Sequence, residues 1–489
     1  MLPCLFFVPD HVHPNHLYAG SPFLMFFFLL VFLVLSLSLA LLLSLSSWLL
    51  STDPVNCFLS FTSSLFPCSS SSSKILNEHR HPSSHITCSL KPLKLLKSLN
   101  QSNRDGHAHR LFLLFTRMLF FMVICSSICM VSAEVEISIP DANLRAAVCS
   151  ALVSSIGLPA NCPVITNIDM LSLTSLSASS VDTFEGLSYA TDLASLTIDG
   201  TSTSDLEIGS TEIGHLPTSS LSTLYLQNIA LSEDVSLSAF TMLTKLDLRN
   251  TGLTDSHSVL GSLSGVEEQL VELTLRDNII SDISALSGMV NLTYLHLYNN
   301  QISDVSPLEN LVELTCLHLG SNQITSIDSL SNMDDLVYLY LYYNNISNIS
   351  ALSGMINLTT LYLYSNSISD VSPLVNITNL TDLRLQSNAI SDISALSGMS
   401  KLSILYLGTN NISDISVLFG KLELLTLDLN SNTLSDISFL SGMSKLANLY
   451  LHNNNISDIS ALSSMNDMNI LYLRDNNISD ISALSGMLK

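Results

Sequence analysis

Apolar residues recur at a fixed interval through the second half of the chain. Between Leu270 and Lys489, every unit of 22 residues has leucine or another apolar residue at positions 1, 4 and 6, and ten units follow without insertion. The alternation at positions 4 and 6 predicts a short strand whose leucines point to one side. A self-similarity of this length outweighs local propensities. Each unit is close to LxxLxLxxNxISDISxLSGMxx, and the units begin at Leu270, Leu292, Leu314, Leu336, Leu358, Leu380, Leu402, Leu424, Leu446 and Met468.

The second half of each unit predicts the rest of the interior. Ile or Val stands at position 14, Leu at position 17 and mostly Met at position 20. Lys421 takes the place of Met in one unit. Because long cationic side chains extend their charged ends into water, we expect the Lys421 ammonium to reach solvent and Leu422 to fill the interior instead.

Looser copies precede the strict ones. They begin at Leu243, Leu221 and Leu193, with a degenerate copy near Leu173. The earlier segment IPDANLRAAVCSAL, from Ile139, has apolar residues at near-helical spacing and would suit a helix that covers the first coil. We therefore divide this part into an N-terminal cap (134–164), degenerate repeats (165–269) and ten strict repeats (270–489).

The repeat unit resembles the leucine-rich repeat of the 22-residue type. Such repeats occur in internalin-like secreted bacterial proteins and in the regulatory subunit of a serine/threonine protein phosphatase. The resemblance implies an α/β solenoid, a right-handed curved array. Its parallel strands would line the concave side, short helical or irregular segments the convex side, and a helical cap the N-terminal end.

Two polar positions of the unit have structural interpretations. Asn at position 9 can satisfy backbone groups where the chain turns inward, since an unpaired buried peptide group costs about 1–3 kcal/mol. Position 13 is mostly Asp, which suits capped turns, with a row of Ca²⁺ ligands as the alternative. The two rows comprise Asn278, Asn300, Asn322, Asn344, Asn366, Asn388, Asn410, Asn432, Asn454 and Asn476, and Asp282, Asp304, Ser326, Asn348, Asp370, Asp392, Asp414, Asp436, Asp458 and Asp480.

Positions 3, 5, 7 and 8 should face the concave side, and aromatic residues concentrate there in adjacent units. Tyrosine offers a large rigid apolar face and a hydroxyl, and it is enriched at binding hot spots. The alternative is that exposed strand positions favour aromatic residues. The predicted ligand-binding residues are Tyr294, His296, Tyr298, His318, Tyr338, Tyr340, Tyr342, Tyr343, Tyr362 and Tyr364.

We expect no catalytic residue, no metal site and no cofactor. His296, His318 and Cys316 lie on one predicted face, but no acidic partner accompanies them, so a zinc site is disfavoured. The chain has no GxSxG, P-loop or HExxH motif, and no GxGxxG between a strand and a helix. The protein is therefore predicted not to be an enzyme.

Composition and charge restrict the partners. The chain has 489 residues, with 18 Lys and Arg against 41 Asp and Glu. Residues 134–489 contain 10 basic and 37 acidic residues, a net charge of −27. A field of this sign repels phosphate backbones, so nucleic acid is excluded as a partner. A protein ligand, basic or glycosylated, is compatible with it.

Two apolar segments precede the cap. Residues 23–50 contain no charge and are long enough for a membrane span, so they could associate the chain with a membrane. Residues 54–117 are Ser-rich and predicted to be disordered. Residues 118–133 resemble a signal peptide that ends in Val131-Ser132-Ala133. Either translation begins at Met118 and residues 1–117 are a gene-model extension, or 23–50 is a genuine anchor; both predict a secreted or cell-surface protein.

Export from the cell would allow disulfide formation at cysteines and glycosylation at asparagines. Cys149 and Cys162 flank one short segment and could form a disulfide in an oxidising compartment, or remain two buried thiols. In a eukaryotic secretory pathway the Asn-x-Ser/Thr sites would accept glycans. After the signal-like segment these sites are Asn291, Asn345, Asn348, Asn357, Asn376, Asn379, Asn411, Asn455 and Asn477.

The sequence thus predicts an extracellular or cell-surface recognition module that binds a protein or glycan on its concave face. The first alternative is an intracellular scaffold or phosphatase regulator, because the same repeat occurs there. The second is a surface coat without a specific ligand. The signal-like segment favours export.

Overall fold

The computed structural model describes residues 134–200, 207–465 and 468–487, all within one compact unit, His107–Lys489. The apolar segments 23–50 and 118–133 and the Ser-rich segment lie outside the described residues. Within the described residues, no helix combines the length and hydrophobicity needed to cross a membrane.

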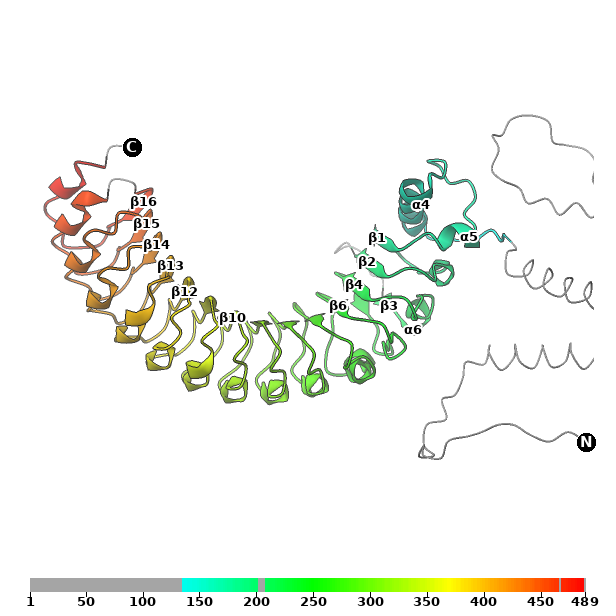
Figure 1. Cartoon of the computed structure of the whole chain (residues 1–489), viewed down its shortest axis with the longest axis horizontal. Coiled ribbons are helices and arrows are strands. Elements are labelled where there is room, and N and C mark those ends of the chain that lie inside the picture. Colours follow the sequence, from blue (N-terminus) through cyan, green and yellow to red (C-terminus); the bar gives the residue numbers. More distant parts are fainter. Residues whose placement is uncertain (1–133, 201–206, 466–467, 488–489) are drawn as a thin grey trace, which may run out of the picture. The chain divides into compact units, whose positions relative to one another are not determined.

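One long parallel sheet runs through the described part of the chain. It contains 14 strands, and its strand order follows the sequence (Figure 1). Pairing joins equivalent positions of successive repeats, as Leu295 and Leu317 show. The strands are β1 (Ser175–Ser179), β2 (Ser195–Asp199), β4 (Thr223–Gln227), β6 (Lys245–Asp247), β7 (Glu272–Thr274), β8 (Tyr294–His296), β9 (Cys316–His318), β10 (Tyr338–Tyr340), β11 (Thr360–Tyr362), β12 (Asp382–Arg384), β13 (Ile404–Tyr406), β14 (Thr426–Asp428), β15 (Asn448–Tyr450) and β16 (Ile470–Tyr472).

The returning half of each coil lies on the outer side of the arc and contains one short helix in the strict repeats (Figure 1). These 3-10 helices are η4 (Ser284–Leu286), η5 (Ser306–Leu308), η6 (Asp328–Leu330), η7 (Ser350–Gly354), η8 (Ser372–Leu374), η9 (Ser394–Gly398), η10 (Ser416–Leu418), η11 (Ser438–Leu440), η12 (Ser460–Ser464) and η13 (Ser482–Leu484). The degenerate repeats instead contain α5 (Asn167–Met170), η2 (Leu187–Tyr189), α6 (Ser210–Ile213), α7 (Ser258–Ser262), η3 (Leu263–Gly265) and a small sheet of β3 (Glu207–Ile208) and β5 (Ala230–Leu231). The predicted curved solenoid is therefore confirmed.

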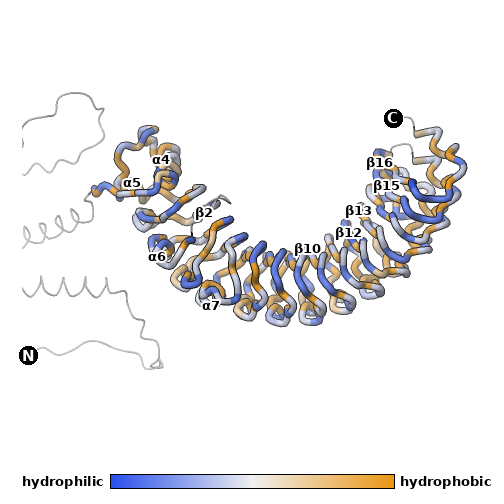
Figure 2. The backbone as a smooth tube through the Cα atoms, turned by 180° about the vertical axis from the view of Figure 1, so that it is seen from behind, coloured by the Kyte–Doolittle hydropathy of each residue, from blue (hydrophilic) through white to orange (hydrophobic). Residues whose placement is uncertain are grey.

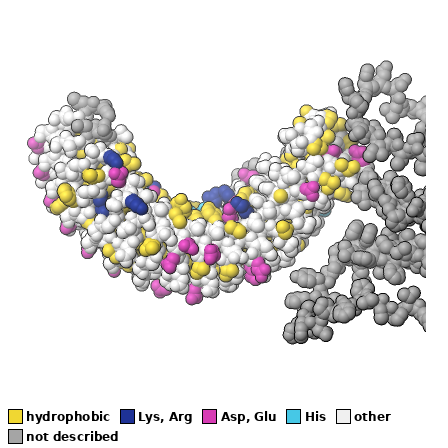
Figure 3. Space-filling view, in the orientation of Figure 1, with side chains coloured by type: hydrophobic (Ala, Val, Ile, Leu, Met, Phe, Trp, Pro, Cys, Tyr) yellow, Lys and Arg dark blue, Asp and Glu magenta, His cyan; other side chains and the backbone are white. Residues whose placement is uncertain are grey.

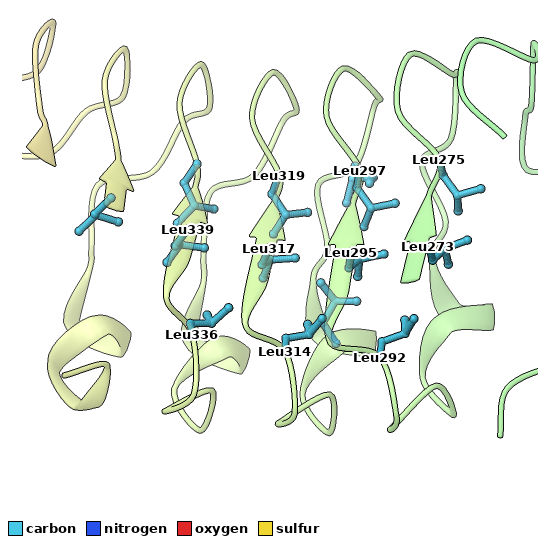
Figure 4. Packing of buried hydrophobic residues seen from close by; sticks show 14 of the residues in the cluster. Leu273, Leu275, Leu292, Leu295, Leu297, Leu314, Leu317, Leu319, Leu336 and Leu339 are labelled. Carbon is cyan, nitrogen blue, oxygen red and sulfur yellow. The ribbon is translucent and has the colours of Figure 1, made fainter. Parts of the chain in front are cut away.

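The interior is a stack of leucine rows. Leu292, Leu295 and Leu297 are fully buried, as are their equivalents in the following coils up to β15, and Figure 4 shows the rows aligned from strand to strand. In the last coil the equivalent residues are partly buried. Hydrophobic and polar stretches alternate within each coil of Figure 2. Each buried leucine contributes about 1.5–3 kcal/mol relative to an exposed one. Six of the seven methionines at position 20, such as Met333, are buried as predicted, and Met487 in the last coil is partly buried.

The asparagine row connects adjacent coils. Asn300 Oδ1 accepts a hydrogen bond from the Ile280 amide at 3.1 Å, and its Nδ2 donates to the Leu275 and Leu297 carbonyls at 3.0 and 3.1 Å. The same pattern recurs at Asn344 and its equivalents. The predicted structural role is confirmed, because each amide satisfies buried backbone groups of two coils.

The aspartates at position 13 organise turns. Asp304 Oδ1 accepts from the Ser306 amide at 2.8 Å, directly at the start of η5, and Asp370 and Asp392 do the same for their own helices. Hydrogen bonds from Ser306 lower the pKa of Asp304. These carboxylates therefore cap turns, as predicted.

Lys421 does not follow the expectation. Its side chain is buried, and Nζ donates to the Ser397 and Met399 carbonyls, each at 3.2 Å. Leu422 is 52% exposed, so it does not fill the interior. The prediction was wrong because η9 of the preceding coil leaves carbonyls unpaired at its C-terminal end, and an inward ammonium can satisfy them.

A helix covers the first coil. In α4 (Ala142–Ile156) the side chains of Leu144, Val148 and Leu152 form one buried stripe next to β1. The helix begins at Asp141, whose carboxylate accepts from the Leu144 amide at 2.7 Å. Cys149 and Cys162 form a disulfide. The N-terminal cap is therefore stabilised by buried apolar side chains, by the Asp141 hydrogen bond at the start of α4 and by this disulfide.

Candidate ligand-binding surface

The ten predicted residues lie together on the concave side, and we call them the aromatic cluster. They are Tyr294, His296, Tyr298, His318, Tyr338, Tyr340, Tyr342, Tyr343, Tyr362 and Tyr364, from strands β8 to β11 and the residues that follow these strands. The buried leucines at positions 4 and 6 direct positions 3, 5 and 7 outward. Tyr294, Tyr338 and Tyr343 are 37%, 45% and 57% exposed, and the other members are half-buried.

Position 5 forms a continuous row of rings. Strand register places His296, His318, Tyr340 and Tyr362 side by side. Successive ring centroids are 4.3, 4.8 and 5.0 Å apart. The row therefore follows the spacing of the strands.

Position 7 forms a second row, which contains a gap. Tyr342 stacks on Tyr364 at 4.6 Å with an interplanar angle of 4°, but Gly320 takes position 7 of the preceding coil. A Cβ atom on Gly320 would lie 2.9 Å from the Tyr342 ring. Because Gly320 has no side chain, the Tyr342 ring occupies the space above it, and the Tyr342 hydroxyl lies 3.0 Å from His318 Nε2. Sequence reasoning missed Gly320, whose signal was a glycine at an outward strand position.

The two histidines are neutral members of this surface. His296 Nε2 and His318 Nδ1 share a hydrogen bond, and Tyr298 stacks on His318 at 5.1 Å. Burial, with repulsion from Arg276, lowers the pKa of His296 to about 4. Burial and the neighbouring His296 lower the pKa of His318 to about 3.

Cys316 does not complete a metal site with them. Burial raises the pKa of its thiol to about 11, which keeps it protonated. Among the described residues, no three His, Cys, Asp or Glu side chains are placed to hold one metal ion. In this structure the two histidines stack on each other, with 4.3 Å between their ring centroids.

An arginine adjoins the cluster toward the C-terminus. The Arg384 guanidinium lies 4.3 Å from the Tyr362 ring centroid and 5.0 Å from that of Tyr406. Asp382 accepts from Arg384 at 3.1 Å and from the Tyr362 hydroxyl at 2.8 Å. Burial and then this carboxylate raise the pKa of Tyr362. Sequence reasoning missed Arg384 and Asp382, although both stand at concave positions.

A polar hollow adjoins the cluster toward the N-terminus. It encloses about 540 Å³ and is lined by Asp199, Gln227, Asn228, Arg249, Asn250, Arg276, Asp277, Asn278 and Asn299. Arg249 Nε donates to the buried Asp247 carboxylate at 2.8 Å, and Arg276 lies 3.6 Å from Asp277. Both arginines are thus already paired. In Figure 3 hydrophobic and basic side chains lie along the inner edge of the arc.

Tyr343 has an unusual backbone conformation. Position 8 adopts a positive φ in every coil from β6 to β16, and Tyr343 has φ 52°. The equivalent residues are Asn250, Asp277, Asn299, Ser321, Ser365, Ser387, Thr409, Ser431, Asn453 and Asp475. Asn and Asp tolerate this region, whereas a bulky residue there is strained. The exposed Tyr343 side chain contributes only edge-on ring contacts to the fold, with Tyr342 at 5.9 Å and Tyr364 at 5.4 Å between ring centroids.

The comparisons agree with this architecture. A family model described as leucine-rich repeats in two copies matches residues 268–310, 312–354, 334–376, 356–398, 378–420 and 423–464. None of the curated proteins compared with the chain matches it.

Solved structures give a closer likeness. The internalin InlF of Listeria monocytogenes is 31% identical, with a TM-score of 0.60, over 70% of this chain and 96% of that one. The functional domain of InlJ from the same organism is 23% identical, with a TM-score of 0.55, over 71% of this chain and 77% of that one. A leucine-rich repeat protein of Leptospira interrogans is 21% identical, with a TM-score of 0.55, over 65% of this chain and 90% of that one. The last two show the fold alone.

Proposed function

The chain belongs to the leucine-rich repeat family, and from this premise we propose that it binds a protein ligand through the aromatic cluster on its concave face. The observation that carries the proposal is that ten aromatic rings gather on four adjacent coils without contributing to the leucine interior. Tyrosine clusters of this kind form the energetic centre of many interfaces. The concave face of a solenoid is the extended surface that such proteins use for binding.

We propose further that binding takes place outside a cell. The Cys149–Cys162 disulfide supports this, since disulfides persist in oxidising compartments and are rare in the cytosol. The signal-like segment 118–133 points the same way, as does the similarity to an internalin. An intracellular scaffold is the second candidate, favoured only by the occurrence of the same repeat in a phosphatase regulator.

The test compares two pairs of tyrosines. The full chain, immobilised, is exposed to solubilised surface proteins of cells, alongside the double variant Tyr340→Ala and Tyr362→Ala. The matched control is Tyr450→Ala and Tyr472→Ala, because those rings also occupy position 5 and pack at 5.3 Å. We expect the cluster variant to lose at least about tenfold in affinity for the captured protein, and the control to retain it.

Two results would contradict the proposal. Equal capture by the folded cluster variant would place the interface elsewhere. A tagged full chain found only in the cytosol, with Cys149 and Cys162 reactive toward thiol reagents, would favour the intracellular alternative.

A further inference from the structure

The aromatic cluster, apart from Tyr343, belongs to a larger surface that carries no charge. We call it the uncharged window and define it as positions 3, 5 and 7 of four coils. The window lies between Glu272 and Arg276 on one side and Asp382 and Arg384 on the other. Its members are Tyr294, His296, Tyr298, Cys316, His318, Gly320, Tyr338, Tyr340, Tyr342, Thr360, Tyr362 and Tyr364. In a region with a net charge of −27, an uncharged window matches an uncharged ligand segment.

Ring orientation narrows the chemistry of that segment. Tyr342 and Tyr364 turn their faces toward each other, at an angle of 4°, and Tyr298 and His318 do so at 11°. One face of each of these four rings is thus covered within the protein, and their edges and hydroxyls are left for a ligand. Sugar rings and free cations bind aromatic faces, so these four rings offer less surface to either.

The window offers hydrogen-bond donors. Within the described residues, no hydrogen bond engages the hydroxyls of Tyr298, Tyr338, Tyr340 or Tyr364. Burial raises the pKa of Tyr340 and Tyr364, which keeps these hydroxyls protonated. The matching ligand groups are acceptors, such as backbone carbonyls that have no partner of their own.

A polyproline II helix provides such carbonyls. It forms no internal hydrogen bonds and advances about 3.1 Å per residue, so that one turn of three residues spans about 9.3 Å. Two coils of the solenoid span about 9.6 Å. Ring spacings of 4.3, 4.8 and 5.0 Å along position 5 agree with that repeat. Aromatic-lined surfaces that donate hydrogen bonds are a recurring means of binding such helices.

We propose that the uncharged window binds a proline-rich segment of a partner protein, in the polyproline II conformation, over about five residues. The proposal rests on the function proposed above and specifies the class of its ligand. The segment would lie along the solenoid axis, with its prolines against the exposed ring edges of the two aromatic rows and its carbonyls toward the tyrosine hydroxyls.

The probe for the test is octaproline blocked at both ends, titrated into the full chain by calorimetry. A blocked Gly-Ser peptide of equal length controls for peptide binding without the preformed helix, and cellohexaose controls for sugar stacking. We expect octaproline to saturate with Kd below about 1 mM, and both controls to bind at least about tenfold more weakly.

A double variant, Tyr340→Phe with Tyr364→Phe, keeps the rings and removes two donors. This variant should bind octaproline about tenfold more weakly without a lower Tm, whereas Tyr450→Phe with Tyr472→Phe should leave the affinity unchanged. Absence of octaproline binding, equal binding of either control probe, or an unaffected cluster variant would each overturn the proposal. If octaproline does not bind while capture of the protein ligand still depends on Tyr340 and Tyr362, the proposed protein-binding function stands and only the proline-rich ligand is excluded.

Discussion

Two stretches of the solenoid share an interior and differ on their concave face. The coils of β8 to β11 present the uncharged window, whereas the coils of β14 and β15 present Thr426, Asp428, Asn448 and Tyr450 on their strands. Behind both surfaces the leucine rows are fully buried. The fold therefore does not require aromatic residues on the inner curve, and their concentration in one stretch supports the binding role that we propose for them.

The first prediction concerns what the two stretches share. Asn344→Ala and Asn432→Ala each remove hydrogen bonds to backbone groups of two coils. We expect each to lower the free energy of unfolding by about 3 kcal/mol, since each leaves three buried groups unpaired. Urea denaturation checks this, and a clearly smaller loss in one stretch would show that the interiors are not equivalent.

The second prediction concerns pH. Because the folded pKa values of His296 and His318 lie near 4 and 3, the unfolded state, with a pKa of 6.5, binds more protons below pH 6.5. The contribution of the two neutral histidines to the free energy of unfolding is intact above pH 6.5 and is lost progressively as the pH falls toward 4. At pH 5 the loss should be about 2 kcal/mol for each histidine.

The measurement is Tm between pH 4 and pH 8. His296→Gln with His318→Gln should flatten the profile in this interval. His452→Gln serves as the control in the other stretch. If the double variant and the unmodified chain lose the same stability, the two histidines are not the origin of the pH dependence.

The third prediction compares two glycines at position 7. Gly320→Ala would place a Cβ 2.9 Å from the Tyr342 ring, so Tyr342 must move away from His318. We expect about tenfold weaker binding of the captured protein. Gly408→Ala, where the Cβ would meet Asn430, should leave the affinity unchanged. Equal effects of the two variants would remove the special role of Gly320.

The smallest expected effect is at Tyr343. Tyr343→Asn should raise the free energy of unfolding by about 1 kcal/mol, because asparagine tolerates the positive φ. The same variant should bind the ligand more weakly. Ser365→Asn is the control, since it also stands at position 8 and lies outside the ring contacts. A gain in stability without a loss of binding would show that Tyr343 does not serve the ligand.

Some features could be predicted residue by residue. The 22-residue period predicted the strands, the buried leucines, the asparagine ladder and the outward tyrosines, because each follows from local spacing repeated many times. Lys421 could not be predicted, because its partners, the Ser397 and Met399 carbonyls, belong to another coil. Gly320 could not be predicted either, because its importance depends on contact with the Tyr342 ring of the next coil.

The sequence by itself determined the solenoid, since a leucine period of constant length has only one way to bury itself against its own copies. It also determined which residues lie on the concave face. Tertiary structure decided how they meet: which rings stack and which histidines share a hydrogen bond. These contacts join residues about 22 positions apart, so they depend on the exact packing of neighbouring coils, which no local pattern specifies.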